Sequence, residues 1–340
     1  MNFSRKLIPA SNVGSLTWCG DTLVDWAGGI QIFHLDGTHA GRRLIWGFNF
    51  DAAAATPDGS FAVLYSRLGT KALLLRDGEI LRELNRSYYF AGTYEYPVCI
   101  WNAADGRTLI AHCPEDYCRI DIENAETGER LTNGDRKPQD FFHSRLSVNA
   151  AGTRLLSAGW IWHPLDAAVH YDIAEALRTP EHLDSRDSCV PNTGNLSFAE
   201  AGSAAWQTED RLLLGGVSDE NEPPNDGAKQ IAGRRLNARG VAVYDVVSKE
   251  YIRSVILEDV PGTMMPVGEE HVVCFYKHPK LVSLESGEVV ARWEDIDSGM
   301  QQSSILVGDK LPPIAMDAKH NRFAVLGPEG IHVVQIDPVE

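Results

Sequence analysis

The chain has 340 residues, of which 44% are hydrophobic and 23% charged, and its 47 acidic against 31 basic residues give a formal net charge of −16. This composition excludes a disordered or collagen-like chain, and no apolar run approaches the ~20 residues that span a membrane. The excess of acids disfavours binding to nucleic acid or to an anionic membrane, because both require a basic surface.

The N-terminal segment and the cysteines indicate where the protein is found. Residues 1–10, MNFSRKLIPA, lack the apolar stretch and the small-residue cleavage site of a secretory signal. The six cysteines are scattered rather than spaced as a disulfide framework. They are Cys19, Cys99, Cys113, Cys118, Cys189 and Cys274. We therefore expect a soluble, cytoplasmic protein with reduced thiols.

In chain order, the predicted elements begin with a lone strand over residues 3–9 and continue as units that repeat one pattern. Each unit has a tight turn, an apolar strand, a loop and a second apolar strand that ends at an acidic residue. The first apolar strands are TLVDW, FAVLY, TLIAH, RLLSAG, RLLLGG, HVVCF and RFAVLG. The acids are Asp36, Asp77, Asp121, Asp172, Asp245, Glu285 and Asp337. Most units add a further turn and strand, such as DGEILREL.

Seven such units in 340 residues average about 49 residues each. Short strands at regular spacing, joined by Asp-Gly and Ser-Gly turns, predict antiparallel hairpins. Four-stranded units of this length are typical of propeller blades, and a ring leaves no sheet edge at its ends, whereas a solenoid leaves two. We therefore predict an all-β, seven-bladed β-propeller of four-stranded antiparallel blades, forming a single domain over residues 1–340.

The two ends of the chain support closure of the ring. The last unit supplies only three strands, PPIAMDA, RFAVLG and IHVVQI, while residues 3–9 form a strand that belongs to no unit. We expect this N-terminal strand to complete the last blade by pairing with residues 331–336.

On these repeats, the chain resembles the WD-repeat-like class of seven-bladed β-propellers over essentially its whole length. In WD repeats a Trp-Asp pair ends the third strand and a Gly-His pair precedes the first. Here the acid is Asp in six of the seven units, but the residue before it is never Trp, and no Gly-His pair occurs. The resemblance implies the architecture, and it implies no particular function because propellers host scaffolds and enzymes alike.

Three interruptions of the repeat are candidate functional loops, because loops vary while blades form the scaffold. They are residues 87–97, an insertion at about 160–202 that contains a predicted helix over 173–178, and an insertion at 217–240. Because loops that join the second and third strands of a blade lie on the same face as loops that join successive blades, we predict that the loops over 88–96, 160–164 and 217–240 share one face. The predicted partner contacts are Tyr88, Tyr89, Tyr94, Tyr96, Trp160, Trp162 and His163. The alternative is that these rings pack between neighbouring blades.

No sequence motif predicts catalysis. The chain has no G-x-S-x-G elbow, P-loop or G-x-G-x-x-G. His163 with His170, and His112 with Cys113 and Cys118, lack the further ligands that zinc requires. The oxygen donors of the 217–240 loop do not have the spacing of an EF-hand. We predict no catalytic residue, no metal and no cofactor.

These observations favour a non-enzymatic scaffold that binds a protein partner through its loop-rich face. The net charge fits a basic partner, and one specific version is a bacterial immunity protein that caps a basic toxin. Two alternatives stay open. One is a metal-dependent, lactonase-like hydrolase or lyase with Asn49, Asp51, Asn102 and His143 in the central channel, and the other is a small-ligand sensor.

Overall fold

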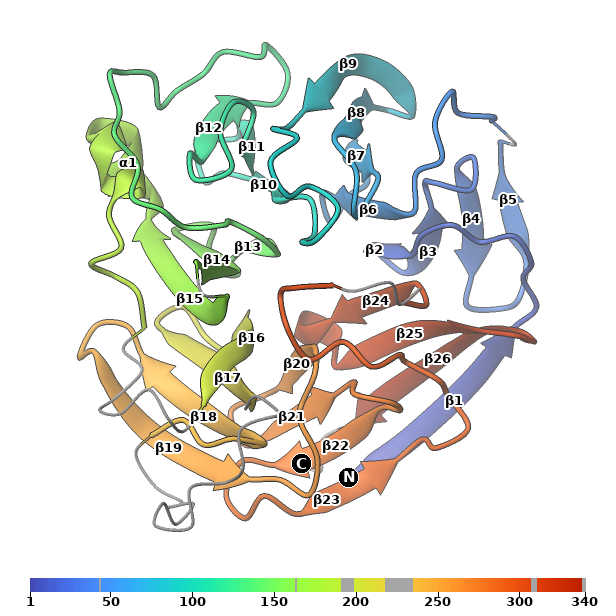
Figure 1. Cartoon of the computed structure of the whole chain (residues 1–340). Helices are drawn as coiled ribbons and strands as arrows, with labels where there is room; N and C mark the ends of the chain where they lie inside the picture. Colours follow the sequence, from blue (N-terminus) through green and yellow to red (C-terminus); the bar gives the residue numbers. More distant parts are fainter. Residues whose placement is uncertain (43, 163, 191–198, 218–234, 307–310, 338–340) are drawn as a thin grey trace. The chain divides into compact units, whose positions relative to one another are not determined.

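The computed structural model describes residues 1–340 except 43, 163, 191–198, 218–234, 307–310 and 338–340 (Figure 1). The described residues form two compact units, one from residues 1–135 with 310–340 and one from residues 136–309. His163 and most of the predicted 217–240 insertion lie outside the described residues. The prediction of a single domain over residues 1–340 stays a prediction.

The first unit contains four antiparallel sheets. Three of them are built from consecutive strands. These strands are β2 (Thr17–Cys19), β3 (Thr22–Asp25), β4 (Gln31–His34) and β5 (His39–Gly41); β6 (Ala52–Ala55), β7 (Phe61–Tyr65), β8 (Lys71–Arg76) and β9 (Glu79–Asn85); and β10 (Val98–Asn102), β11 (Thr108–His112) and β12 (Asp121–Asn124). The fourth sheet contains β1 (Asn2–Ile8), β26 (Gly330–Asp337), β25 (Arg322–Gly327) and β24 (Ile314–Asp317), with the 3-10 helix η2 (Ala318–His320) before β25.

The second unit contains three antiparallel sheets. Their strands are β13 (Leu146–Val148), β14 (Arg154–Ile161) and β15 (Leu165–Asp172); β16 (Glu200–Trp206), β17 (Arg211–Val217), β18 (Gly240–Asp245) and β19 (Glu250–Ile256); and β20 (Met264–Val267), β21 (His271–Cys274), β22 (Lys280–Ser283) and β23 (Val289–Arg292).

Two short helices follow β15, and the first confirms the helix predicted over 173–178. Helix α1 (Ile173–Arg178) begins at Asp172, whose carboxylate accepts a hydrogen bond from the Glu175 N–H at 2.9 Å. It ends before Pro180, which starts the 3-10 helix η1 (Pro180–Asp184). Within the described residues, no helix is long and apolar enough to cross a membrane.

The seven sheets confirm the predicted fold class, an all-β, seven-bladed β-propeller. The innermost strands of successive blades contact one another within each unit. In the first unit β24 contacts β2, β2 contacts β6 and β6 contacts β10; in the second unit β13 contacts β16 and β16 contacts β20. In two blades the fourth strand is reduced to an isolated bridge, Glu123–Arg130 beside β12 and Val169–Cys189 beside β15. Asp121 departs from the predicted pattern, because it begins β12 instead of ending it.

The N-terminal strand completes the last blade, as predicted. Strand β1 pairs antiparallel with β26, Phe3 opposite Ile336 and Ile8 opposite Ile331, and the two strands lie side by side in Figure 1. The guanidinium of Arg322 in the same blade lies 4.0 Å from the centroid of the Trp18 ring in β2. This cation–π contact ties the last blade to the first.

The cores lie between neighbouring blades, so a central strand is buried on both sides. In β7, Phe61, Val63 and Tyr65 pack with residues of the β10–β12 blade, whereas Ala62 and Leu64 pack with residues of the β2–β5 blade. Burial on both sides explains why such strands read as continuous apolar segments and not as an alternating pattern.

Candidate functional site

Four loops of the first unit meet at one end of its blades. Arg67 in the 66–70 loop contacts two of the other loops. Its N–H donates to Asp51 Oδ1 of the 42–51 loop at 2.6 Å, and its carbonyl oxygen accepts from the Tyr96 N–H of the 86–97 loop at 2.8 Å. The rings of Tyr89 and Tyr117, whose centroids are 4.9 Å apart, bring the 86–97 loop against the 113–120 loop. We call this surface the loop face, defined by the described residues of 42–51, 66–70, 86–97 and 113–120.

Arg86 holds the 86–97 loop in shape although its side chain is only 4% exposed. Its guanidinium donates hydrogen bonds to the carbonyl oxygens of Gly69 and Ala91, both at 2.7 Å, and of Tyr94 at 2.9 Å. It also lies 4.6 Å from the ring centroid of Tyr94 and 5.1 Å from that of Tyr96. Burial lowers the pKa of Arg86, and the carbonyl oxygens take the place of water around the charge. These contacts therefore hold the backbone of the 86–97 loop in one conformation.

Three consecutive aromatic side chains of the 86–97 loop are exposed to solvent. Tyr88 is 84% exposed, Tyr89 48% and Phe90 42%, and the Tyr89 and Phe90 rings meet edge to face at 4.8 Å. Phe90 has a φ of 51°, a left-handed conformation that costs on the order of 1–3 kcal/mol for a bulky residue. We call Tyr88, Tyr89, Phe90 and the half-buried Tyr117 the aromatic patch. Exposed aromatic side chains that cluster are typical of binding surfaces.

Tyr94 and Tyr96 require a correction, because the structure buries both predicted contact residues. Their rings pack against the Arg86 guanidinium, and the Tyr96 ring also lies 5.7 Å from that of Tyr65. Burial raises the pKa of both phenols. Tyr94 and Tyr96 are therefore packing residues, and of the four predicted tyrosines it is Tyr88 and Tyr89 that the surface presents.

The second predicted loop, at the turn between β14 and β15 in the second unit, also divides into buried and exposed rings. Trp160 is buried and stacks on Phe142 with 3.7 Å between ring centroids and 10° between planes. Trp162 is 47% exposed, with its ring 5.6 Å from that of Trp160. Trp160 is a packing residue, which corrects the prediction, and Trp162 is an exposed ring. That the predicted loops share one face stays a prediction.

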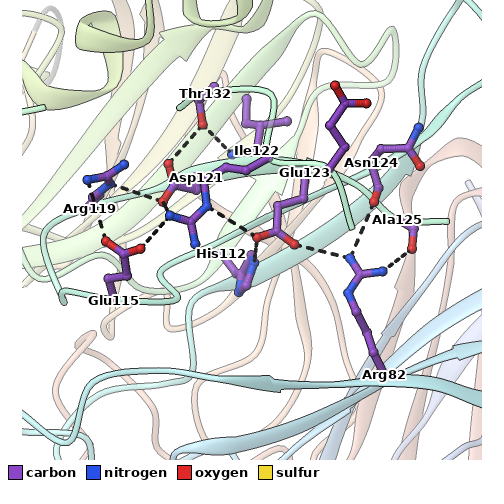
Figure 2. A network of polar contacts seen from close by, with 12 residues as sticks. Arg82, His112, Glu115, Arg119, Asp121, Ile122, Glu123, Asn124, Ala125 and Thr132 are labelled. Carbon is purple, nitrogen blue, oxygen red and sulfur yellow. Dashed lines mark hydrogen bonds and ion pairs between the residues drawn. The ribbon is translucent and has the colours of Figure 1, made fainter. Parts of the chain in front are cut away.

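A polar network ties strand β9 to the neighbouring blade of β10–β12 (Figure 2). Arg82 donates to Glu123 Oε2 at 3.3 Å and to the Ala125 carbonyl oxygen at 2.6 Å. Glu123 Oε1 lies 3.3 Å from Nε2 of the buried His112. Burial opposes the charge on Glu123, but the adjacent imidazole of His112 and the charges of Arg82 and Arg130 outweigh it and lower the pKa of Glu123.

The same network fixes the loop that carries Tyr117. The buried Asp121 accepts hydrogen bonds from Thr132 Oγ1 at 3.1 Å and from Arg119 Nε at 3.2 Å. Glu115 accepts from Arg130 at 2.6 Å. These contacts attach the 113–120 loop to β12 through Arg119 and to Arg130, which forms a bridge with Glu123 of β12, through Glu115. The network therefore positions one side of the aromatic patch.

The structure describes several of the residues that were considered for a metal or catalytic site. Within the part of the chain that the structure describes, no group of three or more His, Cys, Asp and Glu side chains is placed to hold a metal ion. Asn102 Oδ1 accepts from Thr108 Oγ1 at 3.0 Å, and His143 Nδ1 lies 3.0 Å from Ser157 Oγ. Cys113 is buried and Cys118 is half-buried. Burial lowers the pKa of His170 to about 4.

A strap across the second unit is a feature that sequence reasoning missed. It comprises residues 296–306, which run from the β21–β22 loop to β15. At one end the Lys277 N–H donates to the Gly299 carbonyl oxygen at 2.6 Å, and at the other the Ser304 N–H donates to Asp166 Oδ1 at 2.9 Å. In between, a Cβ on Gly202 would collide with the Gln302 carbonyl oxygen. The glycine inside strand β16 was the available signal of a close backbone approach.

The blades and their loops define the class of this protein as a seven-bladed β-propeller of WD-repeat-like architecture. The chain matches no protein-family model and no curated protein sequence. Similarity to solved structures extends over nearly the whole chain and shows the fold.

Three similar structures illustrate the range of propellers that share this fold. One is Kuenenia stuttgartiensis hydrazine synthase, with 12% identity, a TM-score of 0.58 and coverage of 97% of this chain and 96% of that chain. A second is in the Mitotic Checkpoint Complex, with 10% identity, a TM-score of 0.60 and coverage of 99% and 91%. A third is the Myceliophteria thermophila Cps50 (Swd1) β-propeller domain, with 12% identity, a TM-score of 0.57 and coverage of 98% and 100%.

Proposed function

We propose that this chain is a non-enzymatic β-propeller scaffold that binds a protein partner through the loop face of its first unit. The observation that carries the proposal is the aromatic patch, in which Tyr88, Tyr89 and Phe90 are exposed while the buried Arg86 fixes their loop. Exposed apolar rings are unfavourable in water, and a partner that covers them gains hydrophobic free energy. Because the loop is already ordered, binding loses little conformational entropy.

The similar structures are compatible with this proposal without deciding it. One of them belongs to a complex, the Mitotic Checkpoint Complex, and another is a hydrazine synthase, so the architecture serves different functions. The aromatic patch is the feature of this chain that favours partner binding.

The charge of the chain suggests the kind of partner. A net charge of −16 attracts a basic protein and accelerates its encounter. A cytoplasmic immunity protein that caps a basic toxin is one version of the proposal, and a partner identified from the native host tests it.

The experiment compares the wild-type chain with a Tyr88→Ser, Tyr89→Ser double variant. The partner is first identified by affinity capture from the native host, and its affinity for both proteins is then measured by calorimetry. We expect the double variant to melt at the wild-type temperature and to bind at least about tenfold more weakly, because exposed aromatic anchors are typical hot spots.

A matched control separates the patch from general surface hydrophobicity. Ile80 and Leu81 are exposed on β9 of the same part of the chain, and an Ile80→Ser, Leu81→Ser variant should bind the partner with wild-type affinity. Equal affinity of the Tyr88, Tyr89 double variant and the wild type would contradict the proposal.

A further inference from the structure

The cations on the loop face are already engaged within the fold. Arg86 donates to backbone carbonyl oxygens, and Arg119 lies 3.2 Å from Asp121. Arg67 is flanked by Glu95 and Asp51, whose charges raise its pKa against the effect of burial. The guanidinium groups of these three arginines are therefore held by contacts within the fold.

One acidic residue of the loop face, Asp116, has no such side-chain contact among the described residues. Asp116 is exposed, and among the described residues its carboxylate has neither an ion pair nor a hydrogen bond, whereas the preceding Glu115 is paired with Arg130. Asp116 adjoins Tyr117, whose ring packs against that of Tyr89. The patch thus combines aromatic faces with an available negative charge.

We propose that the aromatic patch takes an arginine side chain of the partner, which stacks on Tyr89 and Tyr117 and pairs with Asp116. This assignment rests on the proposed function. A guanidinium is planar and weakly hydrated, so it stacks on aromatic rings while its edge donates to a carboxylate; the ammonium of lysine keeps its water more tightly. A second copy of the chain is a poor occupant, because two chains of net charge −16 repel each other.

The first test uses N-acetyl-arginine amide as the probe, with N-acetyl-lysine amide and N-acetyl-norleucine amide as controls for charge and for chain length. The ring signals of isotopically labelled tyrosines in the full chain are followed by NMR. We expect saturable shifts of the Tyr89 and Tyr117 signals with the arginine probe, at least about threefold weaker binding of the lysine probe, and no saturable shift with norleucine.

The second test removes the charge without changing the shape. Asp116→Asn should weaken the arginine probe at least about threefold, and the effect should fade in high salt. Asp187→Asn, at an exposed aspartate of the second unit, should leave probe binding unchanged. Equal responses to arginine and norleucine, or wild-type probe affinity in Asp116→Asn, would overturn the assignment.

The outcomes separate this inference from the proposed function. If the Tyr88, Tyr89 double variant loses the partner while the arginine probe has no effect, the partner-binding proposal stands and the arginine assignment is wrong. If the probe binds at the patch but the double variant keeps full partner affinity, the loop face is not the partner site and the assignment to a partner arginine fails with it.

Discussion

Ile8 at the end of β1 lies opposite Ile331 at the start of β26, which places the N-terminal strand in the C-terminal sheet. Ile8 is buried with Leu23 and Phe33 of the first blade, while the residues of β1 before it are exposed. Strand β1 therefore completes the last blade in two ways: its backbone hydrogen-bonds to β26, and its Ile8 side chain is buried in the core.

Deletion of residues 1–9 should lower the melting temperature by at least about 5 °C and promote aggregation. The deletion exposes the edge of β26 and removes Ile8 from its core, and free strand edges pair with other chains. Calorimetry and light scattering measure both effects. Ile8→Ala, expected to cost about 2–5 kcal/mol, isolates the side-chain contribution, and an unchanged melting temperature of the deletion variant would refute the closure argument.

Arg86→Met should destabilise the chain by about 2–4 kcal/mol, because it leaves several buried carbonyl oxygens without a donor. Arg86→Lys should recover only part of this loss, since an ammonium has fewer donors and no plane to stack on Tyr94. Urea unfolding measures both variants. The control is Arg42→Met, at an exposed residue paired with Glu79, which should change stability by less than about 1 kcal/mol; similar losses at the two arginines would count against the special role of Arg86.

The aromatic residues of the predicted contact set should separate into two classes on substitution. Tyr94→Ala and Trp160→Ala remove buried rings and should each cost about 3–5 kcal/mol in the free energy of unfolding. Tyr88→Ala removes an exposed ring and should stay within about 0.5 kcal/mol of the wild type. Thermal or urea unfolding distinguishes the classes, and a stable Tyr94→Ala variant would show that its ring is not part of the packing.

Asp166→Asn should become progressively favourable relative to the wild type as the pH rises. Burial raises the pKa of Asp166 above its ordinary 3.8, although Arg145, Ser303 and Ser304 pull it down. A raised pKa means that the folded state holds the proton more tightly than the unfolded state. The wild type therefore loses stability as the pH climbs from about 4 through the folded-state pKa.

The asparagine carries no charge at any pH, and its side-chain oxygen still accepts from Ser304. Urea unfolding of both proteins between pH 3.5 and 7 measures the difference in unfolding free energy. Asp187→Asn serves as the exposed control. A difference that is independent of pH for Asp166→Asn would show that this carboxyl group titrates alike in both states.

The amino-acid sequence by itself determined the blades, the closing strand and the helix at 173–178. In β7, burial on both sides requires apolar residues at every position, and the turns between strands require Gly, Asp or Asn, so the repeat is visible in the residues themselves. The cap at Asp172 and the stop at Pro180 are equally local.

Only the tertiary structure decided which aromatic rings of the loops are exposed. Tyr89 and Tyr94 are five positions apart in one irregular loop, yet one is half exposed and the other buried. An irregular loop has no periodicity that assigns side chains to an inner or outer face, and the Arg86 guanidinium that buries Tyr94 is itself held by carbonyl oxygens from separate loops. The bond between Ser304 and Asp166 is likewise set by chain segments 138 positions apart, a separation at which no local pattern survives.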